Sequence, residues 1–443
     1  GRQCSLKRKA VVFEGAVVAD ASIIGESAVI HPGVKIWPDK EIEAGATVKT
    51  SLIWGARGRR VLFGRYGVTG MVNVDFTPEF AARMGAAFAA TLPKGSTVMI
   101  NRDLHRSPRM LKRGIISGMP SAGVNVLDLQ VVPIPVARYV TRTSDAAGGV
   151  HVRLSPFDDR VVDIKFFGAG GQDLSKDAQR GIERVFFRED FRRVYLDEIG
   201  TIDYAEVPKE RYSRAFLEAL DVDAIWGRHF YIVVDYANAP TAEVLAPLLN
   251  ELGCRIVALN ASLDETKMSI SPQEFQDSLQ QLAKICGALE TAMGVRLDVG
   301  GERVFLVNDR GGIVPGTLLC AAMAAMALRA HNGGTIAVPV SLPNGFEAIA
   351  EEYGGKTLRT KVGFQALMEA ANRPDVIMAS DGVGTFMWPE VLQVPAGMMT
   401  VAKLLEFLAT QDTTLSQAVA AVPPYYTSKG QVGCPWESKG TVM

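Results

Sequence analysis

Branched aliphatic residues recur at every sixth position near the start of the chain. The series consists of Val12, Val18, Ile24, Ile30, Ile36, Ile42 and Val48. Small residues or a valine follow most of its members four positions later, at Ala16, Ser22, Ala28, Val34 and Ala46. A period of six fits neither a helix nor a hairpin, but it is typical of a chain that coils in triangular turns, with one aliphatic side chain pointing inward from each short side. The alternative is a pair of ordinary strands with fortuitous alternation.

The ends of such a coil predict an interface, because its last turn exposes apolar side chains and unpaired strand edges. Over about residues 11–55, the repeat resembles the hexapeptide-repeat left-handed β-helix that is often appended to sugar-1-phosphate nucleotidyltransferases. The resemblance implies more coil upstream of Gly1 and a fused or associated nucleotidyltransferase domain. We expect a homo-oligomer that forms through the β-helix, and an exit from the coil at Trp54 and Gly55.

From Leu62 onward, apolar strand runs alternate with helical patterns, which predicts βαβ units and largely parallel, covered sheets. The expected elements form three blocks, and a charged segment at 188–210 joins the first two. The first block contains strands 96–101 and 123–129 and a helix that begins near Ser107. The second contains strands 230–235 and 255–260 and a helix over 241–252. The third contains strands 303–307, 335–339 and 376–379 and an Ala-rich helix.

Size and composition narrow the function classes. The chain has 443 residues, which favours about three domains, and its net charge of -1 gives no overall signature of binding to nucleic acid or acidic membranes. The most apolar run, Leu318 to Leu328, is too short to span a bilayer and predicts a buried helix. The five cysteines are scattered and form no C-x-x-C pair, which argues against disulfides and zinc. We expect a cytoplasmic protein without nucleic-acid or membrane partners.

Several short motifs occur in the order and spacing found in the α-D-phosphohexomutases, and residues 62–425 resemble that family. The matching stretches, each with the family motif in parentheses, are Phe63 to Gly70 (FGT-x-G-x-RG), Asn101 to Asp103 (GRD), Val131 to Pro135 (PTP), Gly148 to Val150 (before the nucleophile loop), Asp163 to Phe166 (NGIKF), Val233 to Asn238 (start of the second domain) and Arg359 to Gly363 (T-x-VG).

The resemblance implies an α/β fold of three phosphohexomutase-like domains, preceded by a short left-handed parallel β-helix. The expected boundaries are 1–56 for the β-helix, 57–200, 201–297 and 298–425 for domains I to III, and 426–443 for the lead-in to a fourth domain that we expect to be missing.

The resemblance also implies a catalytic serine. The family moves a phosphoryl group between sugar hydroxyls through a phosphoserine in a T-x-SHNP loop, and Ser155 occupies that position here. The following His and Asn are replaced by Pro156 and Phe157. Without these helpers, the alternative is that Ser155 is a solvated turn residue.

The metal loop of the family supplies three aspartates from D-G-D-x-D-R to Mg²⁺. This chain keeps the first carboxylate as Asp298, replaces the second by Gly300 and lengthens the third to Glu302. Two carboxylates with extra waters predict a Mg²⁺ site that is weak or absent. The alternative is an acidic turn in which Arg303 pairs with Glu302 or Asp298.

Loss of polar residues extends to the sugar-binding loops. The sugar-selecting loop G-E-x-S-G-H corresponds to residues 380–386, where Asp381 and Thr385 are the polar side chains left near the expected positions. Thr69 replaces a phosphate-contacting arginine, and His105 falls where another arginine is expected. The residues that the resemblance assigns to sugar-phosphate binding are Arg65, Arg102, Lys165, Arg303, Thr360, Lys361, Asp381 and Thr385.

Two functional hypotheses follow. In the first, the chain is a catalytically degenerate phosphohexomutase module of a nucleotide-sugar biosynthesis protein, with a role in oligomerisation or sugar-phosphate sensing. In the second, it is an active phosphomannomutase or phosphoglucomutase that interconverts hexose 6-phosphate and hexose 1-phosphate through a phosphoserine. Loss of several groups that act on one transition state favours the first, because each contributes several kcal/mol to catalysis.

Overall fold

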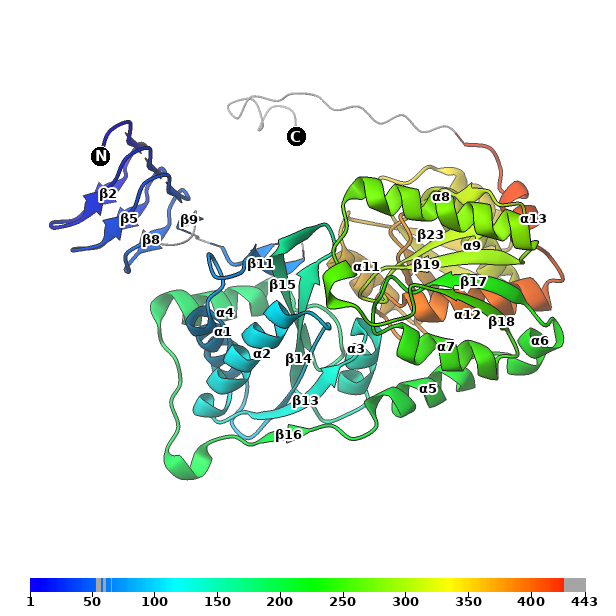
Figure 1. The fold of residues 1–443 in the computed structure, drawn as a ribbon, viewed down its shortest axis with the longest axis horizontal. Helices are drawn as coiled ribbons and strands as arrows, with labels where there is room; N and C mark the ends of the chain where they lie inside the picture. Colours follow the sequence, from blue (N-terminus) through cyan, green and yellow to red (C-terminus); the bar gives the residue numbers. More distant parts are fainter. Residues whose placement is uncertain (53–56, 59–60, 65, 426–443) are drawn as a thin grey trace.

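The computed structural model describes residues 1–52, 57–58, 61–64 and 66–425, which form a small coil of strands and three α/β domains (Figure 1). The expected coil exit at Trp54 and Gly55, the candidate binding residue Arg65 and the segment 426–443 lie outside these residues. No helix in the described part of the chain is long and apolar enough to cross a membrane.

The N-terminal coil consists of two-residue strands in three small parallel sheets, ordered β1-β4-β7-β9, β2-β5-β8 and β3-β6. The first five strands each pair with the strand 18 positions further on, as Ser5 pairs with Ile23 and Ile23 with Glu41, whereas Glu41 pairs with Arg57, 16 positions further on. The strands are β1 (Ser5–Leu6), β2 (Val11–Val12), β3 (Val17–Val18), β4 (Ile23–Ile24), β5 (Val29–Ile30), β6 (Lys35–Ile36), β7 (Glu41–Ile42), β8 (Thr47–Val48) and β9 (Arg57–Gly58).

The later strands of the coil share an apolar interior. Ile24, Ile30, Ile36, Ile42 and Val48 are buried there, and three small residues between them complete the cluster. At the N-terminal end Val12 is 36% exposed, whereas Val18 is half-buried. Because two-residue strands make few hydrogen bonds, we attribute most of the stability of this coil to its buried aliphatic series.

The first α/β domain contains a seven-stranded mixed sheet in the order β10-β11-β15-β14-β12-β13-β16. Its parallel half is β14-β12-β13-β16, and β14 and β15 form an antiparallel hairpin. The elements are β10 (Phe63–Gly64), β11 (Gly67–Met71), α1 (Pro78–Ala90), β12 (Thr97–Arg102), α2 (Arg106–Gly118), β13 (Asn125–Val131), α3 (Ile134–Arg142), β14 (Gly148–Ser155), β15 (Asp158–Gly168), α4 (Lys176–Arg188) and β16 (Ile202–Tyr204).

The second domain has a five-stranded sheet ordered β18-β17-β19-β20-β21, in which β20 and β21 are antiparallel additions. Its elements are α5 (Pro208–Glu218), α6 (Val222–Gly227), β17 (Tyr231–Asp235), α7 (Ala242–Glu251), β18 (Arg255–Leu259), α8 (Pro272–Leu289), β19 (Met293–Leu297), β20 (Val304–Asn308) and β21 (Ile313–Val314).

The third domain has a four-stranded sheet ordered β23-β22-β24-β25. Its elements are α9 (Gly316–Ala330), β22 (Gly334–Pro339), α10 (Gly345–Glu352), β23 (Gly355–Thr360), α11 (Phe364–Ala371), β24 (Val376–Ser380), β25 (Phe386–Met387), α12 (Gly397–Thr410) and α13 (Leu415–Ala420).

Most strands and helices expected from the apolar pattern are confirmed to within a residue or two, including the buried Ala-rich helix, which is α9. The assignment of the strand at 303–307 to the third block is wrong. This strand is β20, and it pairs with β19 in the second sheet, because the short connection 298–303 brings the chain straight back alongside β19. The metal-like loop is therefore a turn between two paired strands.

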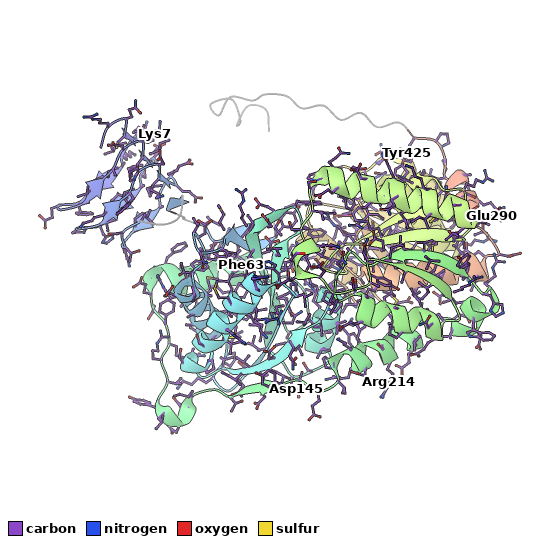
Figure 2. All side chains as sticks on the ribbon, in the orientation of Figure 1. Lys7, Phe63, Asp145, Arg214, Glu290 and Tyr425 are labelled. Atoms are coloured by element: carbon purple, nitrogen blue, oxygen red, sulfur yellow. The ribbon has the colours of Figure 1, made fainter. Side chains whose placement is uncertain are left out.

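Side chains fill the space between the sheets and the helices that cover them (Figure 2). One large apolar cluster runs through the second and third domains and reaches α3 of the first domain, at Val136, Ala137 and Val140. A second cluster forms the interior of the first domain. Because the larger cluster crosses from α3 into the next two domains, apolar packing helps to fix the position of the loops between them.

The coil interior generates a paired test. Replacing the buried Ile24 by Asp places a carboxylate in an apolar cluster, whereas Ile23 beside it is 40% exposed. We expect Ile24→Asp to destabilise the coil by about 3 kcal/mol or more and Ile23→Asp to change its stability by less than about 1 kcal/mol. Hydrogen exchange should show loss of amide protection over residues 5–48 in Ile24→Asp, with the α/β domains unchanged. Equal protection in the two variants would contradict the buried series.

Candidate functional site

Three segments singled out by the sequence lie at the carboxyl ends of strands. Ser155 ends β14, Asp298 follows β19 and Asp381 follows β24. In α/β sheets, such ends are where ligand-binding loops gather. Here Ser155 and Asp298 line one cleft of about 210 Å³, together with Lys165, Glu302 and Arg303 from neighbouring segments. Thr385 of the third domain also lines it, so all three α/β domains contribute to the cleft.

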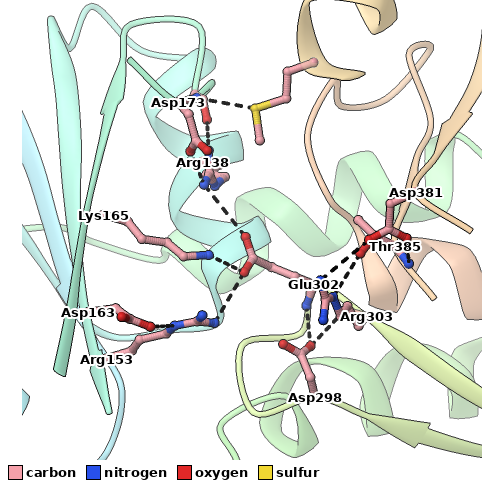
Figure 3. A network of polar contacts seen from close by, with 12 residues as sticks. Arg138, Arg153, Asp163, Lys165, Asp173, Asp298, Glu302, Arg303, Asp381 and Thr385 are labelled. Atoms are coloured by element: carbon pink, nitrogen blue, oxygen red, sulfur yellow. Dashed lines mark hydrogen bonds and ion pairs between the residues drawn. The ribbon is translucent and has the colours of Figure 1, made fainter. Parts of the chain in front are cut away.

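Hydrogen bonds from several directions fix the loop 298–303. Asp298 Oδ1 accepts from the backbone N–H groups of Glu302 at 2.7 Å and Arg303 at 2.8 Å. The first residue of α3, Ile134, donates its N–H to the carbonyl of Gly300 at 3.1 Å. Gly301 has a φ of +73°, and a Cβ there would lie 2.9 Å from Thr241. The loop therefore holds Glu302 in a set position, with its side chain directed toward the first domain (Figure 3).

Glu302 lies among three cationic side chains of the first domain (Figure 3). Its Oε2 atom is 2.5 Å from Lys165 Nζ and 3.5 Å from a terminal nitrogen of Arg153, and its Oε1 atom is 3.7 Å from Arg138. Arg153 also pairs with Asp163 at 3.2 Å, and Arg138 pairs with Asp173 at 2.7 Å. The carboxylate therefore belongs to a buried network of both signs rather than to an open acidic cluster.

The electrostatics of this network keep Glu302 ionised. Burial alone raises the pKa of a carboxyl, but the charges of Lys165, Arg138 and Arg153 outweigh burial and lower the pKa of Glu302 to about 2. Burial and the charge of Glu302 raise the pKa of Asp298. Burial and the repulsion from Arg153 lower the pKa of Lys165, against the attraction of Glu302.

A buried histidine lies beside the same charges. His151 on β14 is 2% exposed, and neither ring nitrogen has a hydrogen-bond partner within the described ranges. Burial, together with Lys165 and Arg153, lowers its pKa well below the ordinary value. His151 is therefore neutral, and it adds no positive charge to the network.

Ser155 stands at a tight hairpin turn. It pairs with Asp158 across the turn formed by Pro156 and Phe157, and β15 continues directly from Asp158. Phe157 packs edge-on against Phe275 of the second domain, with ring centroids 6.2 Å apart. Pro156 and Phe157 offer neither a proton acceptor nor a side-chain hydrogen bond to Ser155.

The loop after β24 is held by its own backbone and by Arg303. Asp381 Oδ1 accepts from the N–H groups of Val383 at 2.9 Å and Thr385 at 3.1 Å. Arg303 Nε donates to Thr385 Oγ1 at 3.0 Å, and an Arg303 terminal nitrogen lies 3.5 Å from Asp381. The expected pairing of Arg303 with Glu302 or Asp298 through its side chain is wrong, because its guanidinium reaches across to the third domain.

Three of the expected binding residues, Arg102, Thr360 and Lys361, are not among those that line the cleft. Lys361 lines an adjoining pocket that shares Lys165 with the cleft. Thr360 is buried, and its hydroxyl donates to the carbonyl of Lys361 at 3.1 Å. Arg102 lines a separate groove on the first domain. Thr69 borders the cleft and donates to Asp163 Oδ1 at 2.7 Å, whereas His105 caps the start of α2.

The donor set at loop 298–303 does not fit Mg²⁺, which takes hard oxygen ligands in a near-octahedral array. Asp298 accepts two backbone hydrogen bonds, Gly300 supplies no carboxylate, and Glu302 faces three cations. Within residues 1–52, 57–58, 61–64 and 66–425, no three His, Cys, Asp or Glu side chains form a group able to hold a metal ion. Weak or absent Mg²⁺ binding stays a prediction.

Sequence reasoning missed Arg138 and Arg153 as partners of Glu302. A signal for Arg153 was present, because β14 is otherwise nearly all apolar and yet carries His151 and Arg153 at alternate positions. Polar side chains in a fully buried strand need charged or hydrogen-bonding partners nearby. The signal for Arg138, one arginine within the short helix α3, was weaker.

Comparison of the chain with known proteins identifies the family to which it is similar. Models of phosphoglucomutase/phosphomannomutase α/β/α domains I, II and III match residues 60–193, 210–312 and 315–426 respectively. The chain is 32% identical to a phosphoglucomutase/phosphomannomutase of Thermococcus kodakarensis, over 83% of this chain and 81% of that protein. It is 28% identical to a probable phosphoglucosamine mutase of Pyrococcus abyssi, over 86% and 83% of the two chains.

A crystal structure of a phosphoglucomutase/phosphomannomutase family protein from Burkholderia thailandensis shares the fold. It superposes with a TM-score of 0.74 at 21% identity, over 83% of this chain and 81% of that one. The three domain matches in order, together with the 32% identity to a relative over 81% of its length, show that the chain belongs to the phosphoglucomutase/phosphomannomutase family.

Proposed function

We propose that this chain is a catalytically degenerate phosphohexomutase module that binds sugar phosphates without turning them over. The observation that carries the proposal is the pairing of the Glu302 carboxylate, which lies 2.5 Å from Lys165 and near Arg153 and Arg138. An internal set of cations neutralises this carboxylate, and the transfer of a phosphoryl group needs a positive charge that is free to act on the moving group. Mg²⁺ beside these three cations adds repulsion.

The serine and the sugar loop support the same proposal. Ser155 sits at a two-residue turn whose side chains, Pro156 and Phe157, supply no general base. Thr385 accepts a hydrogen bond from Arg303, and Asp381 accepts from the backbone of its own loop. Polar groups engaged in this way hold the loop in shape, and less of their hydrogen-bonding capacity remains for a substrate.

Binding without turnover rests on the cationic groups that stay accessible at the cleft. The Arg303 side chain is 26% exposed and Lys267 is 64% exposed, and both line the cleft. Lys176 and Lys361 line the adjoining pocket. These groups can receive a phosphate by charge-assisted hydrogen bonds, and the relatives are named as mutases of phosphorylated sugars.

For residues 1–58 we propose a left-handed β-helix with a role in self-association and in linking the module to a nucleotidyltransferase. The pairing of strands β1 to β5 with the strand 18 positions later supports three six-residue sides per turn. Val11, Phe13 and Val17 are exposed toward the N-terminal end, which supports a covering partner there. The described cysteines are free thiols, which supports a reducing, cytoplasmic setting.

The second candidate function is an active phosphomannomutase or phosphoglucomutase. The observation that favours it is that Ser155 lines the same cleft as Lys165, Asp298 and Arg303. In that case a phosphoserine at residue 155 itself adds negative charge beside Asp298 and strengthens cation binding.

A mutase assay separates the two candidates. With Mg²⁺, a hexose 1-phosphate and a hexose bisphosphate activator, we expect no turnover above background, and the same result for Ser155→Ala, because the turn provides no base and the loop no metal triad. Coupled detection of the hexose 6-phosphate product measures the rate.

Calorimetric titration with hexose 1-phosphate completes that test. We expect binding that Ser155→Ala leaves unchanged and that Arg303→Ala weakens by about tenfold. Turnover that disappears in Ser155→Ala would establish the mutase instead. Absence of both turnover and sugar-phosphate binding would overturn the proposal of a binding module.

The charge of Glu302 generates a prediction on acid stability. The pKa of Glu302 is about 2 in the folded chain, below the ordinary value of 4.5. As the pH falls, this carboxyl therefore takes up its proton at a higher pH in the unfolded chain than in the folded chain. The stabilisation is thus fully present above about pH 4.5 and is lost as the pH falls toward 2. At neutral pH, Glu302→Gln should lower the free energy of unfolding by about 3–5 kcal/mol, because three buried cations lose their partner.

Denaturant unfolding at a series of pH values measures this difference. The difference in the free energy of unfolding between the parent and Glu302→Gln should become smaller below pH 4.5. A matched control is Glu347→Gln, which breaks a more exposed pair with Arg359 and should cost less than about 1 kcal/mol. If the difference in the free energy of unfolding between the parent and Glu302→Gln stays constant with pH, the carboxylate of Glu302 is not ionised and paired as described.

A further inference from the structure

A second hollow lies on the first domain, away from the cleft. It has a volume of about 540 Å³, which is within the range of small-molecule sites. The helix α2, the carboxyl end of β12, the strand β13 and the edge strand β16 line it. Figure 1 shows α2 over this sheet, with β13 and β16 side by side at its edge.

Four cationic side chains line this groove. Arg109, Lys112 and Arg113 are three and four positions apart on α2, so they share one face of the helix. Arg102, at the end of β12, joins them from the sheet. Arg109 and Arg113 are exposed, Arg102 is half-buried and Lys112 is 6% exposed.

The carboxylate that lines the groove, Asp128, is already engaged. Its Oδ2 atom pairs with Lys112 Nζ, and its Oδ1 atom accepts from the backbone N–H of Gln130 at 2.7 Å. Arg102 donates to two backbone carbonyls, of Asp103 at 2.6 Å and of Leu104 at 3.2 Å. Among the described residues, Arg102, Arg109 and Arg113 therefore have no carboxylate partner within ion-pair distance.

Arg109 and Arg113 are both close enough to Arg102 to act on its charge. Burial, followed by the charge of Arg109, lowers the pKa of Arg102. Asp128 pairs with Lys112, so the three guanidinium groups repel each other, and an anion that enters the hollow reduces this repulsion and accepts several N–H bonds. The groove therefore favours a ligand with more than one negative charge.

An apolar and aromatic edge borders the cations. Tyr204 on β16 is 66% exposed, and Ile202 on the same strand is 49% exposed. An exposed tyrosine ring provides a flat surface for stacking a planar heterocycle, which is a common mode of base recognition. The groove thus combines a phosphate-binding side with a ring-binding side.

We propose that this groove binds a nucleoside polyphosphate, with the phosphates on Arg102, Arg109 and Arg113 and the base against Tyr204. The concave shape and the small number of cations fit one small ligand better than a nucleic-acid strand, which needs a continuous basic track. The chain has a net charge of -1, so the cations are a local feature. The site is separate from the sugar-phosphate cleft and does not depend on its activity.

Calorimetric titration with ATP in EDTA tests the proposal on the full chain. We expect saturable binding that Arg109→Ala/Arg113→Ala weakens by about tenfold or more, because two charge-assisted contacts are lost. Each single substitution, which should weaken binding less, serves as the second variant if the double variant has a lowered Tm. The control is Arg184→Ala, which removes an exposed arginine on α4 outside the groove and should leave the Kd unchanged.

Further probes identify which part of the ligand binds. Inorganic tripolyphosphate should compete with ATP, adenosine should not, and Tyr204→Ala should weaken ATP several-fold while leaving tripolyphosphate unchanged. Absence of ATP binding, or equal affinity in the arginine variants and Arg184→Ala, would overturn the site. Tighter binding of a single-stranded oligonucleotide than of ATP would identify nucleic acid as the ligand instead. A Kd for ATP that rises in proportion to the hexose 1-phosphate concentration, as in direct competition, would contradict two separate sites.

Discussion

The buried carboxylate of Glu302 is the constraint on which the functional cleft depends. It lies 2.5 Å from Lys165 on β15 and near Arg153 on β14 and Arg138 on α3, so it connects the turn between β19 and β20 with the first domain. Because an unpaired charge in this position is costly, the turn and the first sheet must keep their relative position. Hydrogen bonds from Ile134 to Gly300, and from Gly397 to Gly301, fix the same turn from two other sides.

This constraint accounts for the chemistry that we assign to the cleft. A carboxylate can be neutralised by a divalent cation or by ammonium and guanidinium groups, and here the protein supplies the latter. The neighbouring groups agree with this arrangement, since Asp298 accepts backbone hydrogen bonds and Arg303 bonds to Thr385. The result is a preorganised cleft with accessible cations at its rim, which suits recognition of a phosphate more than its transfer.

Much of this arrangement was predictable from the sequence. Apolar runs between turn signals located most strands, and the ordered motifs singled out Ser155, Asp298 and Glu302, which line one cleft. The partners of Glu302 were not predictable, because Lys165 lies 137 positions away and no local pattern encodes such a pair. The position of Arg102 in a separate groove was also not predictable from the sequence. Arg102 ends β12, and no local pattern shows which side chains of the following helix α2 share a groove with it.

Calorimetric titration with Mg²⁺ tests the central claim, that internal cations neutralise Glu302 at the loop where the family resemblance implies a metal. The account predicts no saturable Mg²⁺ binding to the parent chain at millimolar concentrations and a gain of binding in Gly300→Asp/Glu302→Asp, since a Cβ at residue 300 would lie 3.3 Å from an Asp298 oxygen. The neutral variant Gly300→Asn/Glu302→Asn controls for side-chain volume. Tight Mg²⁺ binding by the parent that Glu302→Gln abolishes would contradict the account.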